Sequence, residues 1–167
     1  MSRSRRRTWT ELRKEMVASP ARAFGTLYRR FQSAANEAYA TRGWTGATLS
    51  HVQFLTEIDE EGTRLTDVAT ALGTTKQYAG KLARDLESKG FVTLGADRTD
   101  RRAVLARPTT RGRTFYEDAC EVRATLEKDF LAPLSAPRRA AFVAVLEDLE
   151  AFAERRAGRS VAVIDRP

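Results

Sequence analysis

The residues best able to do chemistry in this sequence are hydrogen-bonding and cationic side chains spaced along one short predicted helix, residues 75–88. Ala79, Leu82, Ala83 and Leu86 recur at the spacing of a buried helical face, which leaves a polar set to face outward. The outward set consists of Thr75, Lys76, Gln77, Tyr78, Lys81 and Arg84. Side chains of these types contact phosphates and hydrogen-bond to base edges, so this helix is expected to read double-stranded DNA.

A second basic group lies in the turn expected at residues 95–102, between two predicted strands. This turn contains Arg98, Arg101 and Arg102. A basic hairpin tip of this kind can enter a DNA minor groove or contact phosphates. Asp100 is expected to orient Arg102 through a charge-assisted hydrogen bond.

Local signals predict a helix-turn-helix followed by a β-hairpin as the scaffold for these side chains. Thr66 is expected to cap a first helix, and Gly73 can adopt the positive φ that ends it. Residues 74–77 fit a capping box at the start of the second helix. Strands are then expected at residues 91–94 and 103–106.

The whole segment resembles the winged helix of the MarR family of bacterial transcription regulators. The resemblance rests on residues 65–69, 72–76, 86–92, 100–103 and 109–112, of which Asp-Arg-Arg-Ala followed by Thr-x-x-Gly is the most specific part. It implies a mostly α fold with a small β-wing, in which a winged helix-turn-helix is flanked by N- and C-terminal dimerisation helices. It also implies a homodimer that binds a pseudo-palindromic DNA operator and responds to a small-molecule effector.

The distribution of charge agrees with a polyanion partner. The chain of 167 residues has a formal net charge of +7. Residues 1–15 carry a net charge of +4 and residues 63–112 carry +5, whereas the rest of the chain is slightly acidic. Positive charge therefore concentrates on the predicted winged unit and on an N-terminal arm, as in a nucleic-acid binder.

Apolar periodicity divides the rest of the chain into helices around this unit. The expected organisation is a basic N-terminal extension, an N-terminal dimerisation helix, the winged helix-turn-helix domain, C-terminal dimerisation helices and a flexible tail. These segments span residues 1–19, 20–45, 46–109, 110–157 and 158–167, respectively.

The flanking helices carry more apolar surface than a winged unit of this size needs, which favours a two-fold dimer over a monomer with a small helical bundle. A dimer would place two reading helices about one DNA turn apart. The residues expected in its interface are Phe24, Phe31, Phe142, Leu146 and Leu149.

A ligand site is expected where the dimerisation helices meet the winged unit, because the family resemblance implies small aromatic or acidic ligands there. The candidate residues are His51, Arg29, Arg30, Tyr39, Trp44 and Phe54. His51 follows a predicted Ser50 helix cap, and it could equally be a satisfied structural histidine. The aromatic candidates could equally be core.

The expected function is a dimeric, sequence-specific DNA-binding regulator, a repressor released by a small molecule. Two alternatives remain on the same scaffold: a redox switch through Cys120, and a non-specific architectural DNA-binding protein. No nucleophile elbow, phosphate-binding glycine loop or metal-ligand spacing is present in the sequence, so we expect neither an enzyme nor a cofactor or metal.

The N-terminus has basic residues but no apolar segment typical of a signal peptide, so a cytoplasmic protein is expected. Trp9, Leu12 and Met16 share one side of a possible short helix behind the arginines of the arm. Two roles stay open for this arm: non-specific attraction to DNA by its arginines, and packing of Trp9 against the dimerisation helices.

Overall fold

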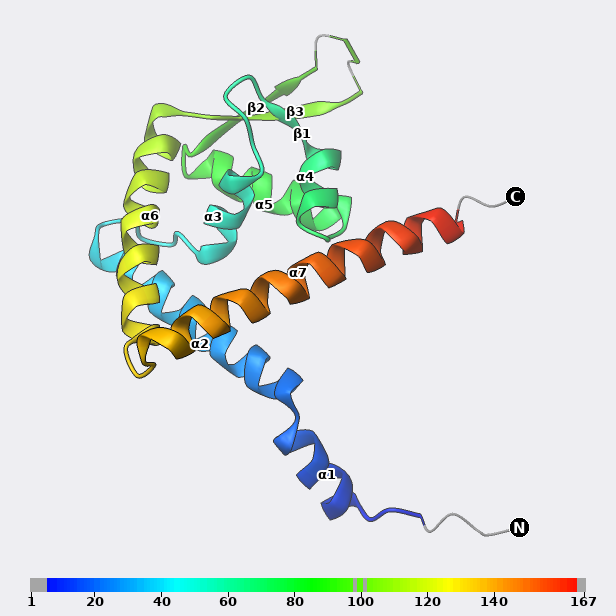
Figure 1. The fold of residues 1–167 in the computed structure, drawn as a ribbon. Coiled ribbons are helices and arrows are strands. Elements are labelled where there is room, and N and C mark those ends of the chain that lie inside the picture. Colours follow the sequence, from blue (N-terminus) through cyan, green and yellow to red (C-terminus); the bar gives the residue numbers. More distant parts are fainter. Residues whose placement is uncertain (1–5, 98, 101, 165–167) are drawn as a thin grey trace. The chain divides into compact units, whose positions relative to one another are not determined.

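The structure is a computed structural model that describes residues 6–97, 99–100 and 102–164, with only the backbone of residues 157–164. It is mostly helical with a small antiparallel sheet, as the sequence predicts (Figure 1). The elements in chain order are α1 (Trp9–Ala18), α2 (Pro20–Thr41), α3 (Leu49–Thr56), β1 (Thr63–Arg64), α4 (Leu65–Ala71), α5 (Lys76–Ser88), β2 (Val92–Ala96), β3 (Val104–Pro108), α6 (Thr110–Leu131) and α7 (Ala136–Ile164).

The strands form an antiparallel sheet in the order β1-β3-β2, and the β2–β3 hairpin projects from the helices (Figure 1). Leu94 of β2 and Thr63 of β1 both pair with Ala106, which is fully buried in the middle of β3. The hairpin is longer than the sequence suggests, since pairing continues to Pro108 opposite Val92. Proline is tolerated there because β1 pairs only with Leu105 and Ala106, so at Pro108 the strand has a partner strand on one side alone.

Three helix starts differ from the sequence prediction. Extended Arg64, rather than Thr66, precedes α4, because β1 runs directly into that helix. Thr75 caps α5, and its hydroxyl accepts a hydrogen bond from the Tyr78 N–H at 3.1 Å, so the cap is one residue later than a box from Thr74 requires. Similarly, α3 begins after Thr48 rather than at a Ser50 cap. Gly73, with φ of +60°, directly follows the last turn of α4 and ends that helix, as expected.

Aromatic rings form the centre of the core. Phe91 stacks on Phe115 with ring centroids 4.6 Å apart, and Tyr39 and Trp44 each meet Phe115 at 5.4 Å. Tyr39 and Phe54 are 1% and 0% exposed, so these two ligand candidates are core residues in this conformation. Their ring faces are already covered by protein side chains.

The start of α6 lies unusually close to the end of the α5–β2 connection. A Cβ added to Gly112 would stand 1.9 Å from the carbonyl oxygen of Phe91. The Thr109 hydroxyl donates to the carbonyl of Gly90 at 2.6 Å and accepts from the Gly112 N–H at 2.9 Å. Thr109 therefore caps α6 and also ties this helix to the residue pair that follows α5.

The described chain divides into two compact units at residue 126. In the second unit, α7 continues to Ile164, beyond residue 157, where the sequence interpretation begins a flexible tail. Several of the apolar side chains described on this helix are exposed, among them Phe142, Leu146 and Leu149. Within the described residues, no helix combines the length and apolar character needed to cross a bilayer.

Gly112→Ala should destabilise the fold by at least about 2 kcal/mol, because the new methyl group would overlap backbone that cannot rotate away. Chemical denaturation of the purified protein measures this loss. The matched control is Gly80→Ala in α5, where the added Cβ meets only the flexible end of Arg84, at 3.7 Å. That change should stabilise the protein by about 0.5–1 kcal/mol through helix propensity. Equal stability of the two variants would contradict the close approach at Gly112.

Candidate nucleic-acid interface

The outward face of α5 carries the polar residues that the sequence assigns to DNA. Thr75, Lys76, Gln77, Tyr78, Lys81 and Arg84 are all exposed. The opposite side is buried through Ala79, Gly80, Ala83 and Leu86, and small residues there let the helix lie close to its neighbours. Lys76, Gln77 and Tyr78 form the first turn, where the positive end of the helix dipole favours a nearby phosphate.

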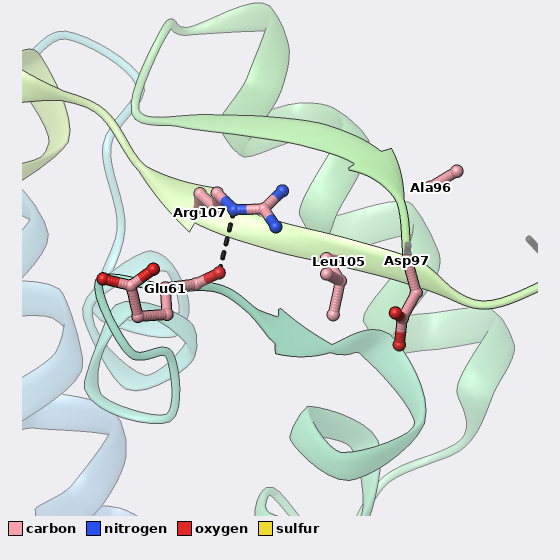
Figure 2. Close-up of a pocket in the computed structure, with 5 residues that line it drawn as sticks. All are labelled: Glu61, Ala96, Asp97, Leu105 and Arg107. Carbon is pink, nitrogen blue, oxygen red and sulfur yellow. Dashed lines mark hydrogen bonds between the residues drawn. The ribbon is translucent and has the colours of Figure 1, made fainter. Parts of the chain in front are cut away.

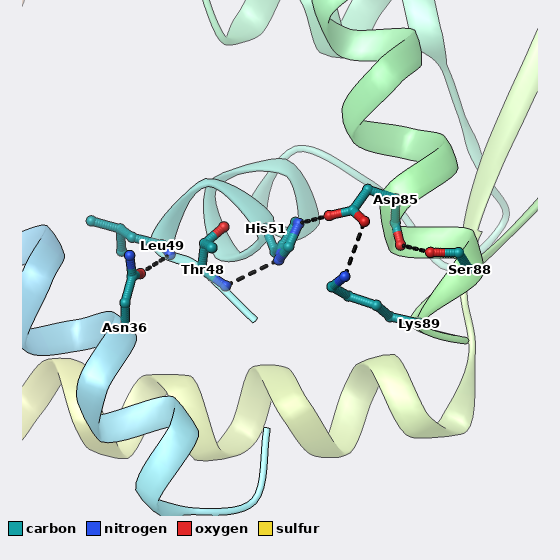
Figure 3. Close-up of polar contacts among 7 residues, drawn as sticks. All are labelled: Asn36, Thr48, Leu49, His51, Asp85, Ser88 and Lys89. Carbon is teal, nitrogen blue, oxygen red and sulfur yellow. Dashed lines mark hydrogen bonds and ion pairs between the residues drawn. The ribbon is translucent and has the colours of Figure 1, made fainter. Parts of the chain in front are cut away.

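The same helix is attached to α3 through a buried histidine (Figure 3). His51 is 2% exposed, and its Nε2 lies 2.7 Å from Oδ2 of Asp85. Burial lowers the pKa of His51 more strongly than Asp85 raises it, so the ring is neutral at pH 7. The hydrogen bond from Lys89 is the largest of the effects that lower the pKa of Asp85, so this carboxylate is ionised. Both ring nitrogens of His51 are thus hydrogen-bonded within the protein, and His51 has a structural role.

The tip of the wing is held by Asp97, which sequence reasoning did not assign. Its carboxylate accepts from the backbone and hydroxyl of Thr99, both at 2.8 Å, and from Nε of Arg64 at 2.8 Å. These bonds, led by the Thr99 backbone N–H, lower the pKa of Asp97 to about 2. A residue of β1 thereby fixes the hairpin tip, a pairing across 33 positions that local sequence patterns cannot indicate.

The tip itself departs from one expectation. Asp100 accepts a hydrogen bond from the backbone N–H of Arg102 at 3.0 Å. This bond is to the backbone of Arg102, so the Asp100 carboxylate shapes the turn. Arg102 is exposed, as a phosphate contact must be, whereas Arg98 and Arg101 lie outside the described residues.

A hollow of about 430 Å³ lies beside the base of the wing (Figure 2). It is lined by Glu61, Ala96, Asp97, Leu105 and Arg107. Arg107 donates from Nε to the carbonyl of Glu61 at 2.8 Å, which joins the end of the sheet to the loop before β1. Both acidic and basic groups rim this hollow, so its charge favours neither an anion nor a cation.

The six predicted ligand residues do not come together. Arg29 and Arg30 are exposed on α2, where Arg29 donates to the Thr26 hydroxyl at 3.1 Å. The Trp44 indole donates to Asp118 of α6 at 2.6 Å, so its polar atom is already used. Tyr39 and Phe54 lie in the core, whereas His51 lines a cleft.

That cleft, of about 430 Å³, lies between the start of α3 and the outward face of α5. Its walls are Gly46, Thr48, Ser50, His51, Tyr78, Lys81, Leu82 and Asp85. It places the aromatic ring of Tyr78 and the ammonium group of Lys81 beside hydroxyl groups from α3. The approach of α3 to α5 that creates it joins residues about thirty positions apart, so the sequence did not reveal it.

Other reactive groups are scattered. Cys120 is exposed on α6, which is the accessibility that a redox switch requires. Across residues 6–97, 99–100 and 102–164, no three His, Cys, Asp or Glu side chains are grouped to hold a metal ion.

The fold and this arrangement define a winged helix-turn-helix protein with additional helices at both ends. Residues 45–103 match the model of the MarR family, and curated protein sequences give no match. The winged-helix region is therefore similar to the MarR family, as its sequence motifs suggested.

Solved structures agree with this fold. A crystal structure of MarR is 19% identical, with a TM-score of 0.72 over 95% of this chain and 99% of that protein. MepR from S. aureus, in complex with DNA, is 19% identical, with a TM-score of 0.69 over 80% and 97% of the two chains. PcaV from Streptomyces coelicolor, in complex with its natural ligand, is 24% identical, with a TM-score of 0.63 over 83% and 96%.

The hydrogen bonds to Asp97 predict how the wing responds to acid. Since the folded-state pKa is depressed, their stabilisation is complete above the ordinary Asp pKa of about 3.9 and is lost as pH falls through about 2. NMR titration of the carboxylate should give a midpoint near 2. In Arg64→Ala the midpoint should rise but stay below the ordinary value, because the Thr99 bonds remain. An ordinary midpoint in the unmodified protein would contradict this wing geometry.

Proposed function

We propose that this chain is a homodimeric, sequence-specific DNA-binding transcription regulator of the cytoplasm, a repressor whose DNA affinity is lowered by a small molecule. The observation that carries the proposal is the exposed polar face of α5 beside a braced hairpin. An exposed helix after a tight turn can enter the major groove, and the hairpin can contact the adjacent backbone. The relative MepR, which shares the fold, was solved with DNA, and this supports the same role here.

The proposed DNA contacts divide by chemistry. Gln77, Tyr78 and Lys81 face the major groove and contact base edges, while Thr75, Lys76 and Arg84 lie nearer to phosphates. On the wing, Arg98, Arg101 and Arg102 supply positive charge to phosphates or the minor groove.

Apolar surface supports the homodimer. Phe24 on α2 is 50% exposed, and Phe142, Leu146 and Leu149 on α7 are exposed as well, while Phe31 is half-buried. Large apolar side chains that recur on exposed helices indicate a protein interface. A two-fold interface through these helices would let two copies of α5 read a pseudo-palindromic operator.

The cleft between α3 and α5 supports control by a small molecule. Tyr78 and Lys81 line this cleft and are also proposed DNA contacts. A molecule bound there would occupy the side chains that DNA needs, so it would bind the free protein more tightly than the DNA-bound form. This difference in affinity is what releases the DNA. The relative PcaV was solved with its natural ligand, which supports effector binding within this fold.

Selection from random duplexes should yield an operator, on which the role of Gln77 can be measured. Gln77→Ala should weaken operator binding by about 1–3 kcal/mol and relax preference at one or two base pairs, because a base-edge hydrogen bond is lost. Gln53→Ala, the same change on α3, serves as the control and should keep the preference. Equal losses on operator and random duplex would remove Gln77 from base reading.

Leu146→Asp should convert the dimer into monomer, because an unpaired carboxylate in an apolar interface is costly. Sedimentation velocity measures the mass of both proteins at one concentration. Asp148→Ala changes a charge about 200° round the same helix and should remain dimeric. If the unmodified protein sediments as a monomer, the two-fold model fails.

A further inference from the structure

We propose that His51 is a positioning residue for DNA binding: by fixing Asp85 to the first turn of α3, it sets the direction in which α5 presents Tyr78 and Lys81. This inference rests on the proposed function, because it concerns the same helix face. His51 itself is buried and does not touch DNA in this account.

The ring of His51 has one available arrangement. Its Nδ1 accepts a hydrogen bond from the backbone N–H of Thr48 at 3.0 Å. In the neutral ring the proton must then reside on Nε2, which donates to Asp85 at 2.7 Å. Each ring nitrogen is therefore committed to a different helix, and the ring works as a rigid spacer between α3 and α5.

On α5, the second carboxylate oxygen of Asp85 accepts from Nζ of Lys89 at 2.9 Å. Asp85 follows Lys81 by four residues and Tyr78 by seven, so the three side chains share one face of the helix. They also line one cleft. A bond to Asp85 thus acts on the face that carries the proposed DNA contacts.

On α3, the first turn is fixed to α2. The backbone N–H of Leu49 donates to Oδ1 of Asn36 at 2.8 Å, next to the Thr48 N–H that holds His51. Figure 3 shows these contacts leading from Asn36 through the start of α3 to Asp85. The His51–Asp85 bond therefore fixes the position of α5 relative to the start of α3, which is itself bound to α2.

Loss of the His51–Asp85 bond should change the direction in which α5 presents its outward face more than it changes the stability of the protein. The Asp85 side chain is 47% exposed and lines the same cleft as His51, so water can take its place as the partner of Nε2 when the carboxylate is removed. The buried side of α5, through Ala79, Ala83 and Leu86, is unaffected by a change at Asp85. Ala79, Gly80 and Ala83 on that side are small, so the bond to Asp85 adds a contact of defined geometry to the packing of the helix.

Electrostatics alone predicts the opposite outcome to positioning. Asp85 is a negative charge on a helix proposed to face phosphates, so its removal should strengthen binding to any duplex. If the carboxylate positions α5, its removal should instead weaken binding to the operator. The ratio of operator affinity to random-duplex affinity separates the two effects.

The experiment compares Asp85→Ala with Asp85→Asn in the full-length chain. Both variants lose the same charge and the same ion pair with Lys89, but asparagine keeps an oxygen that accepts from Nε2 of His51. We expect Asp85→Ala to lower the operator-to-random ratio about tenfold, the loss of one charge-assisted hydrogen bond. Asp85→Asn should restore most of that ratio, and thermal unfolding of the two variants should be similar.

Two results would overturn the inference. If both variants keep the ratio of the unmodified protein, or lose it equally, the bond to His51 does not position α5. If the unmodified protein itself binds all duplexes alike, the proposed function fails and the positioning role fails with it. The proposed function and the positioning role are both supported if the unmodified protein and Asp85→Asn prefer the operator over random duplex and Asp85→Ala does not.

Discussion

The contact between the first turn of α6 and the carbonyl of Phe91 is the constraint on which the rest of the structure depends. Only glycine at position 112 allows the two backbones to approach this closely. The Thr109 hydroxyl, bonded to Gly90, then closes the end of α5 against the start of α6. Because Phe91 also stacks on Phe115, one residue connects α5, the sheet and the aromatic core. The C-terminal end of α5 is thereby fixed, and the wing begins from a fixed point.

Polar contacts of Asp85 and Asp97 then orient α5 and the hairpin, which the core holds in place. The turn at Gly73 and the small buried residues of α5 allow this helix to pack closely. His51 of α3 helps to specify the rotation of this helix through Asp85, and Arg64 of β1 specifies the hairpin tip through Asp97. Charge-assisted bonds suit this role because they require definite distances and angles, whereas apolar contacts tolerate small rotations.

The sequence predicted what depends on local periodicity and missed what depends on distant pairing. The exposed face of α5, the turn at Gly73 and the hairpin follow from spacing and turn chemistry, and the structure confirms them. Two adjacent threonines offered equally good caps for α5, so the first residue of that helix was misplaced by one. The bonds from Asp85 and Asp97 span more than thirty positions, and no local pattern distinguishes those aspartates from solvated ones.

The connection from α2 to α5 relates the two halves of the proposed function. Phe24 and Phe31 of α2 are proposed to contact a second copy, and Asn36 of the same helix holds the start of α3. His51 continues that path to α5. In a two-fold dimer, the distance between the reading helices then depends on how each α3 is seated on its α2. A ligand in the cleft between α3 and α5 would act at the last of these joints, so a small displacement there changes the spacing that DNA requires.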